Sequence, residues 1–167
     1  LAACPDVSAA VLFVDIDNFK QVNDRLGHQR GDELLRSLGE AFRSVLRPTD
    51  VLGRIGGDEF IVFLPEMAET DSVNHCVERL RARFSALLDD SLRSCGVTCC
   101  IGVARYPKDG GDCATLIRKA DAALYIGKRS GKNRVVFAGQ VAAQGSFDLE
   151  PPLPGSHVPP ILTGPEA

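Results

Sequence analysis

An acidic, glycine-containing turn between two apolar segments constrains the fold of this chain more than any other feature. Residues 54–59 have the sequence Arg-Ile-Gly-Gly-Asp-Glu, and apolar residues stand on both sides, at 51–52 and 60–64. This pattern predicts a β-hairpin with the two glycines at its turn. Because glycine has no side chain and tolerates positive φ, a ligand can approach the main chain there. The adjacent carboxylates indicate a hard cation with phosphate bound through it, although a solvated turn with surface acids would present the same residues.

Two further carboxylates follow the first apolar segment. Residues 9–14 form a continuous apolar run of strand length, which is typical of a central strand covered on both faces. Asp15 and Asp17 come where this strand ends, and ligands bind at the carboxyl ends of strands in open α/β sheets. Helix N-capping would account for one of the two aspartates. It does not account for both, since one of them lies on the strand itself.

The periodicity of the remaining chain alternates between helix and strand. Helical spacing and capping residues predict four helices, beginning near residues 18, 31, 70 and 112. β-rich runs predict strands over 97–104 and 135–137, in addition to the first strand and the hairpin. This order predicts an α/β fold in which helices flank a mixed central sheet. Residues 139–167 contain six of the ten prolines and no periodicity, so we expect a domain over residues 1–138 and a disordered or linker tail over 139–167.

Length and composition limit the class of protein. The 167 residues favour one domain, and a hydrophobic share of 44% suffices for a buried core. A net charge of −3 gives no basic field for nucleic acid, and no apolar run approaches the roughly 20 residues that span a bilayer. Since no signal peptide is visible and the six cysteines lack zinc-binding spacing, we expect reduced, mostly buried thiols in a cytoplasmic domain. The first strand begins so early that we expect a trimmed piece of a longer protein, which could itself be membrane-anchored.

Several motifs together resemble the GGDEF domain of diguanylate cyclases. They lie at residues 15–24, 27–28, 31–35, 54–60, 101–104, 120–125 and 128–133. The match extends from about residue 9 to 138 with order and spacing preserved, so it is far more specific than a single glycine pattern. The resemblance implies a mixed five-stranded central sheet flanked by helices, similar to nucleotidyl cyclases and polymerase palm domains. It also implies that two facing domains, each holding one GTP, form cyclic di-GMP and release two pyrophosphates.

The resemblance assigns the metal-binding and catalytic residues. Asp15, Asp58 and the carbonyl of Ile16 would bind Mg²⁺ or Mn²⁺, which lowers the pKa of the ribose 3′-hydroxyl and shields the phosphate charge. Asp58 is also the candidate that helps to deprotonate this hydroxyl, and Glu59 has a supporting catalytic role. Asp17 is interpreted as structural, since carboxylates beside a metal site often orient its ligands.

The guanine base is assigned to Asp32 and Asn23. One carboxylate can accept both donors on the Watson–Crick edge of guanine, and Asp32 stands at the matching position, with Asn23 as a second contact. An N-cap of the long helix would explain Asp32 equally well from the sequence. Some relatives that accept ATP lack this aspartate, so its presence favours GTP. Gly57 is expected to allow the nucleotide to approach closely.

The phosphates are assigned to main-chain amides and two lysines. Asn18, Phe19 and Lys20 would offer N–H groups at a helix start. Lys128 and Lys132 match the family's basic pair, although the second position is often arginine in relatives, and lysine lacks the bidentate fork. A solvated helix C-terminus, where cations are favoured, would also explain both lysines.

Arg47 and Asp50 form an R-x-x-D pattern just before the hairpin, which matches the family's inhibitory site for cyclic di-GMP. An arginine at a helix end followed by an aspartate in a turn is common, so the match depends on the spacing of this pair before Gly56. The resemblance implies product feedback at these two residues.

Three functions compete for these residues. We expect a diguanylate cyclase that works as a homodimer under an upstream sensor domain, without a nucleic-acid partner. The alternative is a catalytically silent module that binds GTP or cyclic di-GMP, and the intact Asp15, Asp58 and Glu59 argue against it. Asp32 argues against a cyclase of other base specificity. The family's D-x-L-T-G-L-x-N-R segment before the first strand is absent, so we expect the isolated chain to be monomeric and slow.

Overall fold

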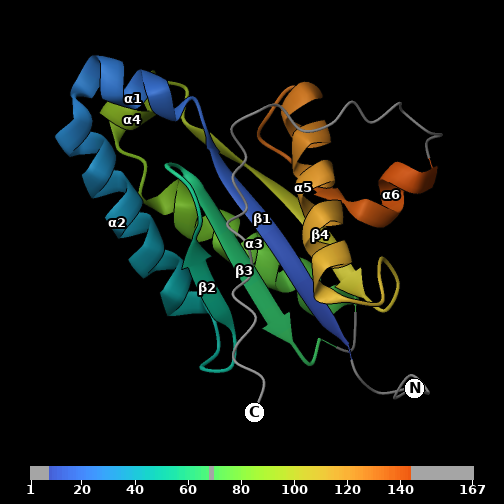
Figure 1. Cartoon of the computed structure of the whole chain (residues 1–167). Helices are drawn as coiled ribbons and strands as arrows, with labels where there is room; N and C mark the ends of the chain where they lie inside the picture. The colour runs from blue at the N-terminus through green and yellow to red at the C-terminus, as the bar shows by residue number, and fades with distance from the viewer. Residues whose placement is uncertain (1–7, 68–69, 144–167) are drawn as a thin grey trace, which may run out of the picture.

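The computed structural model describes residues 8–67 and 70–143, which form one five-stranded sheet with helices on both faces (Figure 1). The strands are β1 (Ala9–Asp17), β2 (Val51–Arg54), β3 (Glu59–Pro65), β4 (Thr98–Tyr106) and β5 (Val135–Phe137). Their order is β2-β3-β1-β4-β5, so β1 is central. It pairs antiparallel with β3 and β4, β2 pairs antiparallel with β3, and β5 runs parallel to β4. The predicted mixed sheet and the predicted hairpin are confirmed.

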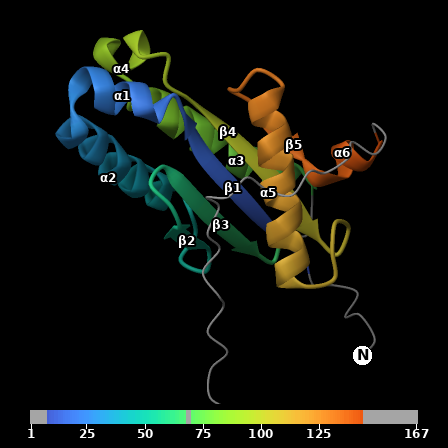
Figure 2. The same cartoon turned by 45° about the horizontal axis from the view of Figure 1, so that its top comes forward.

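The helices divide between the two faces of this sheet. They are α1 (Phe19–Leu26), α2 (His28–Val45), α3 (Thr70–Ala86), α4 (Asp90–Ser94), α5 (Cys113–Arg129) and α6 (Ala138–Ala143). Helices α2 and α3 cover one face over the larger apolar core, and α5 covers the other face over a smaller one (Figure 1, Figure 2). Helix α5 approaches β4 closely, because a Cβ on Gly102 would lie 2.0 Å from the carbonyl oxygen of Ala120.

Side chains along β1 alternate between the two cores. The even-numbered residues from Ala10 to Ile16 belong to the larger core, whereas Val11 and Phe13 belong to the core under α5. Asp15 and Asp17 continue the row of Val11 and Phe13, because residues two apart on a strand share a face. Both aspartates are buried. At its carboxyl end, the central strand thus has two carboxylates on the same face as the apolar side chains of Val11 and Phe13.

Local signals explain most helix boundaries, and one interpretation was wrong. Asp112 caps α5, as predicted, because its Oδ1 accepts a hydrogen bond of 2.9 Å from the N–H of Thr115. Gly27, with φ at 86°, ends α1 and precedes α2 directly. Since α2 begins at His28 rather than near residue 31, Asp32 lies inside the helix and is not its N-cap.

The structure adds two short helices that periodicity did not predict. Helix α4 is capped by Asp89, whose side chain accepts from the N–H of Leu92. Helix α6 begins at the expected domain boundary of residue 138 and continues regular structure to Ala143. The rest of the expected tail, residues 144–167, lies outside the described residues. In the described parts of the chain, no helix is both long and apolar enough to cross a membrane.

The described cysteines are free thiols, and Cys99 and Cys100 face the opposite cores of the sheet, as their neighbouring positions on a strand predict.

Candidate active site

The hairpin turn lies against the carboxyl end of β1. Asp15 on β1 stands opposite Glu59 on β3 in the antiparallel register. The N–H of Ile16 donates a 3.3 Å hydrogen bond to the carbonyl of Asp58. Two acidic segments that are more than forty residues apart in the sequence therefore form one acidic centre.

Burial and mutual repulsion shape the electrostatics of this acidic centre. Burial raises the pKa of Asp15 to about 6, Lys128 opposes the shift, and the charges of Asp58 and Glu59 add to it. Burial also raises the pKa of Glu59, with Asp58 and Asp121 adding to the shift and Lys128 opposing it. Burial of these two carboxylates therefore favours their protonated forms or a cation beside them.

Lys128 supplies the cation that faces Asp15. Its Nζ lies 2.5 Å from Oδ2 of Asp15, across the gap between α5 and β1. Burial alone would lower the pKa of Lys128, but the hydrogen bond and charge of Asp15, together with Asp58 and Glu59, raise it. The lysine is consequently charged and held within the acidic centre.

The acidic centre fits a divalent cation in chemistry. Within residues 8–67 and 70–143, no three acidic, imidazole or thiol side chains are arranged to hold a metal ion, and Lys128 is the cation on Asp15. The donors are nevertheless hard carboxylate oxygens, which Mg²⁺ prefers. Burial of the Asp15 carboxylate, which raises its pKa, is a penalty on its negative charge that a divalent cation beside it would offset. The main chain of Ile16, next to Asp15 on β1, is hydrogen-bonded to the main chain of Asp58.

Arg54 and the two glycines set the shape of the hairpin turn. The Arg54 guanidinium donates to the carbonyls of Gly56 and Gly57 at 2.7–3.2 Å. A Cβ on Gly56 would lie 2.5 Å from a carboxylate oxygen of Glu59, so that side chain folds over the glycine. A Cβ on Gly57 would meet nothing within 4 Å, so its main chain faces open space.

The residues assigned to guanine lie on two adjacent helices. Asp32 is exposed on α2 and lines a groove together with Arg54 and Phe60 of the hairpin. Asn23 of α1 lies against Gly31, because a Cβ there would be only 2.1 Å from Asn23 Oδ1. Asn23 thus lies against Gly31, the residue before Asp32, and Asp32 lies in the groove beside the hairpin.

The residues assigned to phosphate gather where β1 passes into α1. Phe19 and Lys20 form the first turn of α1, where main-chain N–H groups lack partners within the helix. Asn18 precedes them with φ at 61°, and its Oδ1 accepts a 2.7 Å hydrogen bond from Nζ of Lys132. With Lys128 on Asp15, both lysines of the predicted basic pair lie at the carboxyl end of β1.

A family model described as diguanylate cyclase, GGDEF domain, matches residues 2–134. The chain belongs to the GGDEF family. It is 39% identical over 142 residues to the cyclic di-GMP phosphodiesterase NbdA of Pseudomonas aeruginosa, covering 84% of this chain and 18% of NbdA. It is 41% identical over 128 residues to the diguanylate cyclase DosC of Escherichia coli, covering 75% of this chain and 27% of DosC. The chain therefore spans less than a third of the length of these two relatives.

Solved GGDEF structures have the same fold. The GGDEF domain of DgcB from Caulobacter crescentus, in complex with c-di-GMP, superposes with a TM-score of 0.68 at 33% identity. The superposition covers 80% of this chain and 79% of that one. The expected palm-like GGDEF fold is confirmed.

The R-x-x-D residues of this GGDEF domain lie in another groove. Arg47 and Asp50 line it with His75 and Arg79 of α3. The buried carboxylate of Asp50 accepts a 2.7 Å hydrogen bond from the N–H of Arg47, which closes the turn after α2. The structure does not bring this pair together with the acidic centre.

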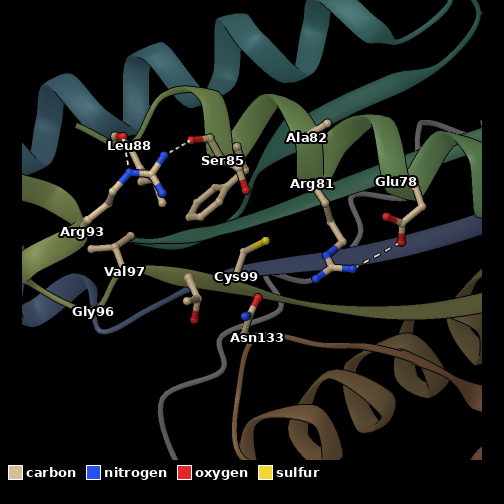
Figure 3. Close-up of a pocket in the computed structure, with 12 residues that line it drawn as sticks. Glu78, Arg81, Ala82, Ser85, Leu88, Arg93, Gly96, Val97, Cys99 and Asn133 are labelled. Carbon is tan, nitrogen blue, oxygen red and sulfur yellow. Dashed lines mark hydrogen bonds and ion pairs between the residues drawn. The ribbon is translucent and has the colours of Figure 1, made fainter. Parts of the chain in front are cut away.

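Three polar residues near the site were not predicted. Arg54 orders the hairpin turn, and Asp121 is half-buried near Lys128 and Glu59. Asp121 and Lys128 are seven residues apart, so both lie on one face of α5. Helical periodicity from Lys128 could therefore have identified Asp121 as a site residue. Asn133 lines a groove between α3 and the start of β4, beside Cys99 and near Arg81 (Figure 3); it lies in the 128–133 motif, which assigned it no role.

Proposed function

We propose that this GGDEF domain is one half-site of a diguanylate cyclase, which condenses two GTP into cyclic di-GMP and two pyrophosphates. The observation that carries the proposal is the acidic centre of Asp15, Asp58 and Glu59 with Lys128 at the carboxyl end of β1. A reaction on a polyanionic substrate needs hard oxygen ligands for a metal and cations for phosphate in one place. Few structural roles require both together.

The acidic centre would carry the chemistry. Asp15, Asp58 and the carbonyl of Ile16 would hold Mg²⁺ or Mn²⁺. When bound, this ion would lower the pKa of the 3′-hydroxyl and shield the phosphate charge. Asp58 accepts the proton of this hydroxyl as its oxygen attacks the α-phosphorus of the facing GTP. Pyrophosphate leaves as the new P–O bond forms, and the same step on the other side closes the ring. Glu59 supports Asp58 by adding negative charge.

The surrounding residues would bind and orient the substrate. Asp32 accepts hydrogen bonds from N1–H and N2–H of guanine, and Asn23 makes a second contact to the base. Lys128 transfers from Asp15 to phosphate oxygens, where Lys132 already lies beside Asn18.

The main-chain N–H groups at the start of α1, from Asn18 through Phe19 and Lys20, would bind the same phosphates. Gly57 leaves room for the nucleotide beside the turn.

Assembly and regulation complete the proposal. Each domain holds one GTP, so turnover requires a homodimer in which two half-sites face each other. Cyclic di-GMP binds Arg47 and Asp50 in their separate groove and inhibits the enzyme. The domain works in the cytoplasm under an upstream sensor domain.

A catalytically silent module that binds GTP or cyclic di-GMP is the second candidate. One relative that matches this region, NbdA, is named a cyclic di-GMP phosphodiesterase rather than a cyclase. The carboxylates of the acidic centre favour the cyclase, because a binding module has no use for a proton acceptor beside a metal site.

The test uses the domain fused to a dimerising coiled coil, incubated with GTP and Mg²⁺, with chromatographic identification of the products. The unmodified domain is expected to form cyclic di-GMP, and Asp58→Ala is expected to form none. Asp90→Ala is a matched control, since Asp90 is an exposed acid on α4. Absence of product from the unmodified domain, with GTP still bound, would favour the silent module.

A further inference from the structure

We propose that Asp17 is a positioning residue, which fixes the segment 131–133 after α5 and thereby places Lys132 at the phosphate end of the nucleotide site. The proposal rests on the proposed function, in which Lys132 binds phosphate. Asp17 itself touches no substrate in this account. It acts through the main chain of a residue far away in the sequence.

The carboxylate of Asp17 is a buried anchor with three donors. Its Oδ2 accepts from the hydroxyl of Thr98 at 2.7 Å, from the thiol of Cys100 at 3.4 Å and from the N–H of Asn133 at 3.0 Å. The residue is only 2% exposed. Its second oxygen, Oδ1, is buried with no hydrogen-bond partner in the described structure. A carboxylate buried this deeply needs donors, and these three together stabilise it in the folded domain.

The Asn133 hydrogen bond is the contact that reaches the phosphate end. It joins the end of the central strand to a segment 116 residues further along the chain. The side chain of Asn133 lines the groove between α3 and β4 (Figure 3), while its main-chain N–H donates to Asp17. Asp17 therefore holds the path of the chain rather than one particular side chain.

This segment has a backbone that needs outside support. Gly131, Lys132 and Asn133 have φ of 110°, 62° and 48°, so three consecutive residues occupy the left-handed region. Non-glycine residues adopt this conformation at a cost in free energy and keep it when surrounding contacts impose it. The N–H of Lys132 donates to the carbonyl of Gly127 at 3.1 Å, and the Asp17 bond to Asn133 fixes the other side.

The position of Lys132 follows from this segment. Its Nζ donates to Asn18 Oδ1 at 2.7 Å, and Asn18 Nδ2 donates to the carbonyl of Gly96 at 2.7 Å. Two adjacent residues at the end of β1 thus bind the segment 131–133. Asp17 accepts from the main-chain N–H of Asn133, and Asn18 accepts from the side chain of Lys132. An ammonium has three N–H donors, so the contact with Asn18 leaves donors for phosphate.

The test is a double-mutant cycle on binding of a GTP analogue whose α,β bond cannot be cleaved, with Mg²⁺, measured by calorimetry. Asp17→Asn and Lys132→Ala are each expected to weaken binding about tenfold, the loss typical of one hydrogen bond to a charged group. The double variant is expected to bind no more weakly than either single variant, because both remove the same contact. Additive losses would overturn the proposal and make Asp17 a general stabiliser of the fold.

Two controls separate positioning from loss of stability. Asp109 is also a buried aspartate, and it accepts from the N–H of Arg105 at 2.8 Å beyond the opposite end of β4. Asp109→Asn is expected to lower the melting temperature and to bind the analogue normally. Thr98→Val removes a different donor to Asp17 and keeps the Asn133 bond, so it is expected to bind normally too.

A measurement on the unmodified domain covers the case in which Asp17→Asn does not fold. Hydrogen exchange of the Asn133 amide is expected to be slow, and exchange at the rate of an unprotected amide would overturn the proposal. If Lys132→Ala alone leaves analogue binding unchanged, the phosphate role of Lys132 fails and this proposal with it. That outcome would leave the cyclase chemistry at Asp58 untouched, because product formation tests it separately.

Discussion

Asp15→Asn is expected to stabilise the metal-free domain at pH 8 while removing a proposed metal ligand. Asp15 is 3% exposed, and burial is the main reason why the pKa of its carboxyl is raised. Asparagine has nearly the same shape and no charge to desolvate. The variant therefore keeps the packing at the end of β1 and loses the electrostatic penalty that the acidic centre imposes.

The magnitude follows from the pKa shift of Asp15, from 3.8 to about 6. At about 1.4 kcal/mol per pKa unit this shift corresponds to about 3 kcal/mol, a net figure in which the opposing attraction of Lys128 is already included. Since the folded-state pKa is the higher one, the stability that protonated Asp15 contributes is complete below the unfolded value of 3.8. It is lost as the pH rises through about 6.

Urea unfolding in EDTA measures this effect. At pH 8 the variant should exceed the unmodified domain by about 1–3 kcal/mol, and the advantage should shrink by about 2 kcal/mol at pH 4.5. Adding Mg²⁺ should stabilise the unmodified domain and not the variant. Asp109→Asn, which weakens another buried acceptor, should instead lose stability at pH 8. An Asp15→Asn domain less stable than the unmodified one at pH 8, or a pH-independent difference, would refute the reasoning.

Three further substitutions test the geometry around the acidic centre. Gly31→Ala puts a Cβ 2.1 Å from Asn23 Oδ1, so it should displace Asn23 and lower the free energy of unfolding by about 1–3 kcal/mol. It should also weaken GTP binding measured by calorimetry, and an unchanged affinity would contradict the base-binding role of Asn23. Arg54→Ala removes the donors to the turn carbonyls and should slow turnover about ten- to a hundredfold with an unchanged melting temperature; unaltered turnover would show that the turn keeps its shape without Arg54. Asp112→Ala removes the cap of α5 and should lower the unfolding free energy by about 1 kcal/mol with turnover unchanged, and equal denaturation midpoints would contradict the cap.

Local signals made much of the fold predictable from the sequence. The hairpin follows from two glycines between β-rich runs, and the start of α5 follows from Asp112 before a helical stripe. These features depend on residues within one turn or one strand, which periodicity and capping describe well. The short helices α4 and α6 escaped prediction because five or six residues carry too little periodicity, and isolated helices of that length are unstable.

The sequence indicated which residues belong to the candidate site, but not which of them contact one another. Motif spacing selected Asp15, Asp58 and Lys128, yet only the fold shows that Lys128 faces Asp15. The hydrogen bond from Asn133 to Asp17 joins two residues that are more than a hundred positions apart in the sequence, and no local pattern encodes such a pairing. The position of Asp32 inside α2 also depends on where Gly27 ends the preceding helix. Long-range contacts therefore account for what the sequence pattern left open.

The most direct test of the central claim is pyrophosphate release from GTP and Mg²⁺ by the coiled-coil dimer, unmodified and with Asp15→Asn. The unmodified dimer should release two pyrophosphates for each cyclic di-GMP. The variant should release none while unfolding at a higher urea concentration than the unmodified domain in EDTA, a combination that misfolding cannot produce. Pyrophosphate release by the folded variant at a rate near that of the unmodified dimer would contradict the claim that the acidic centre at the end of β1 carries out the reaction.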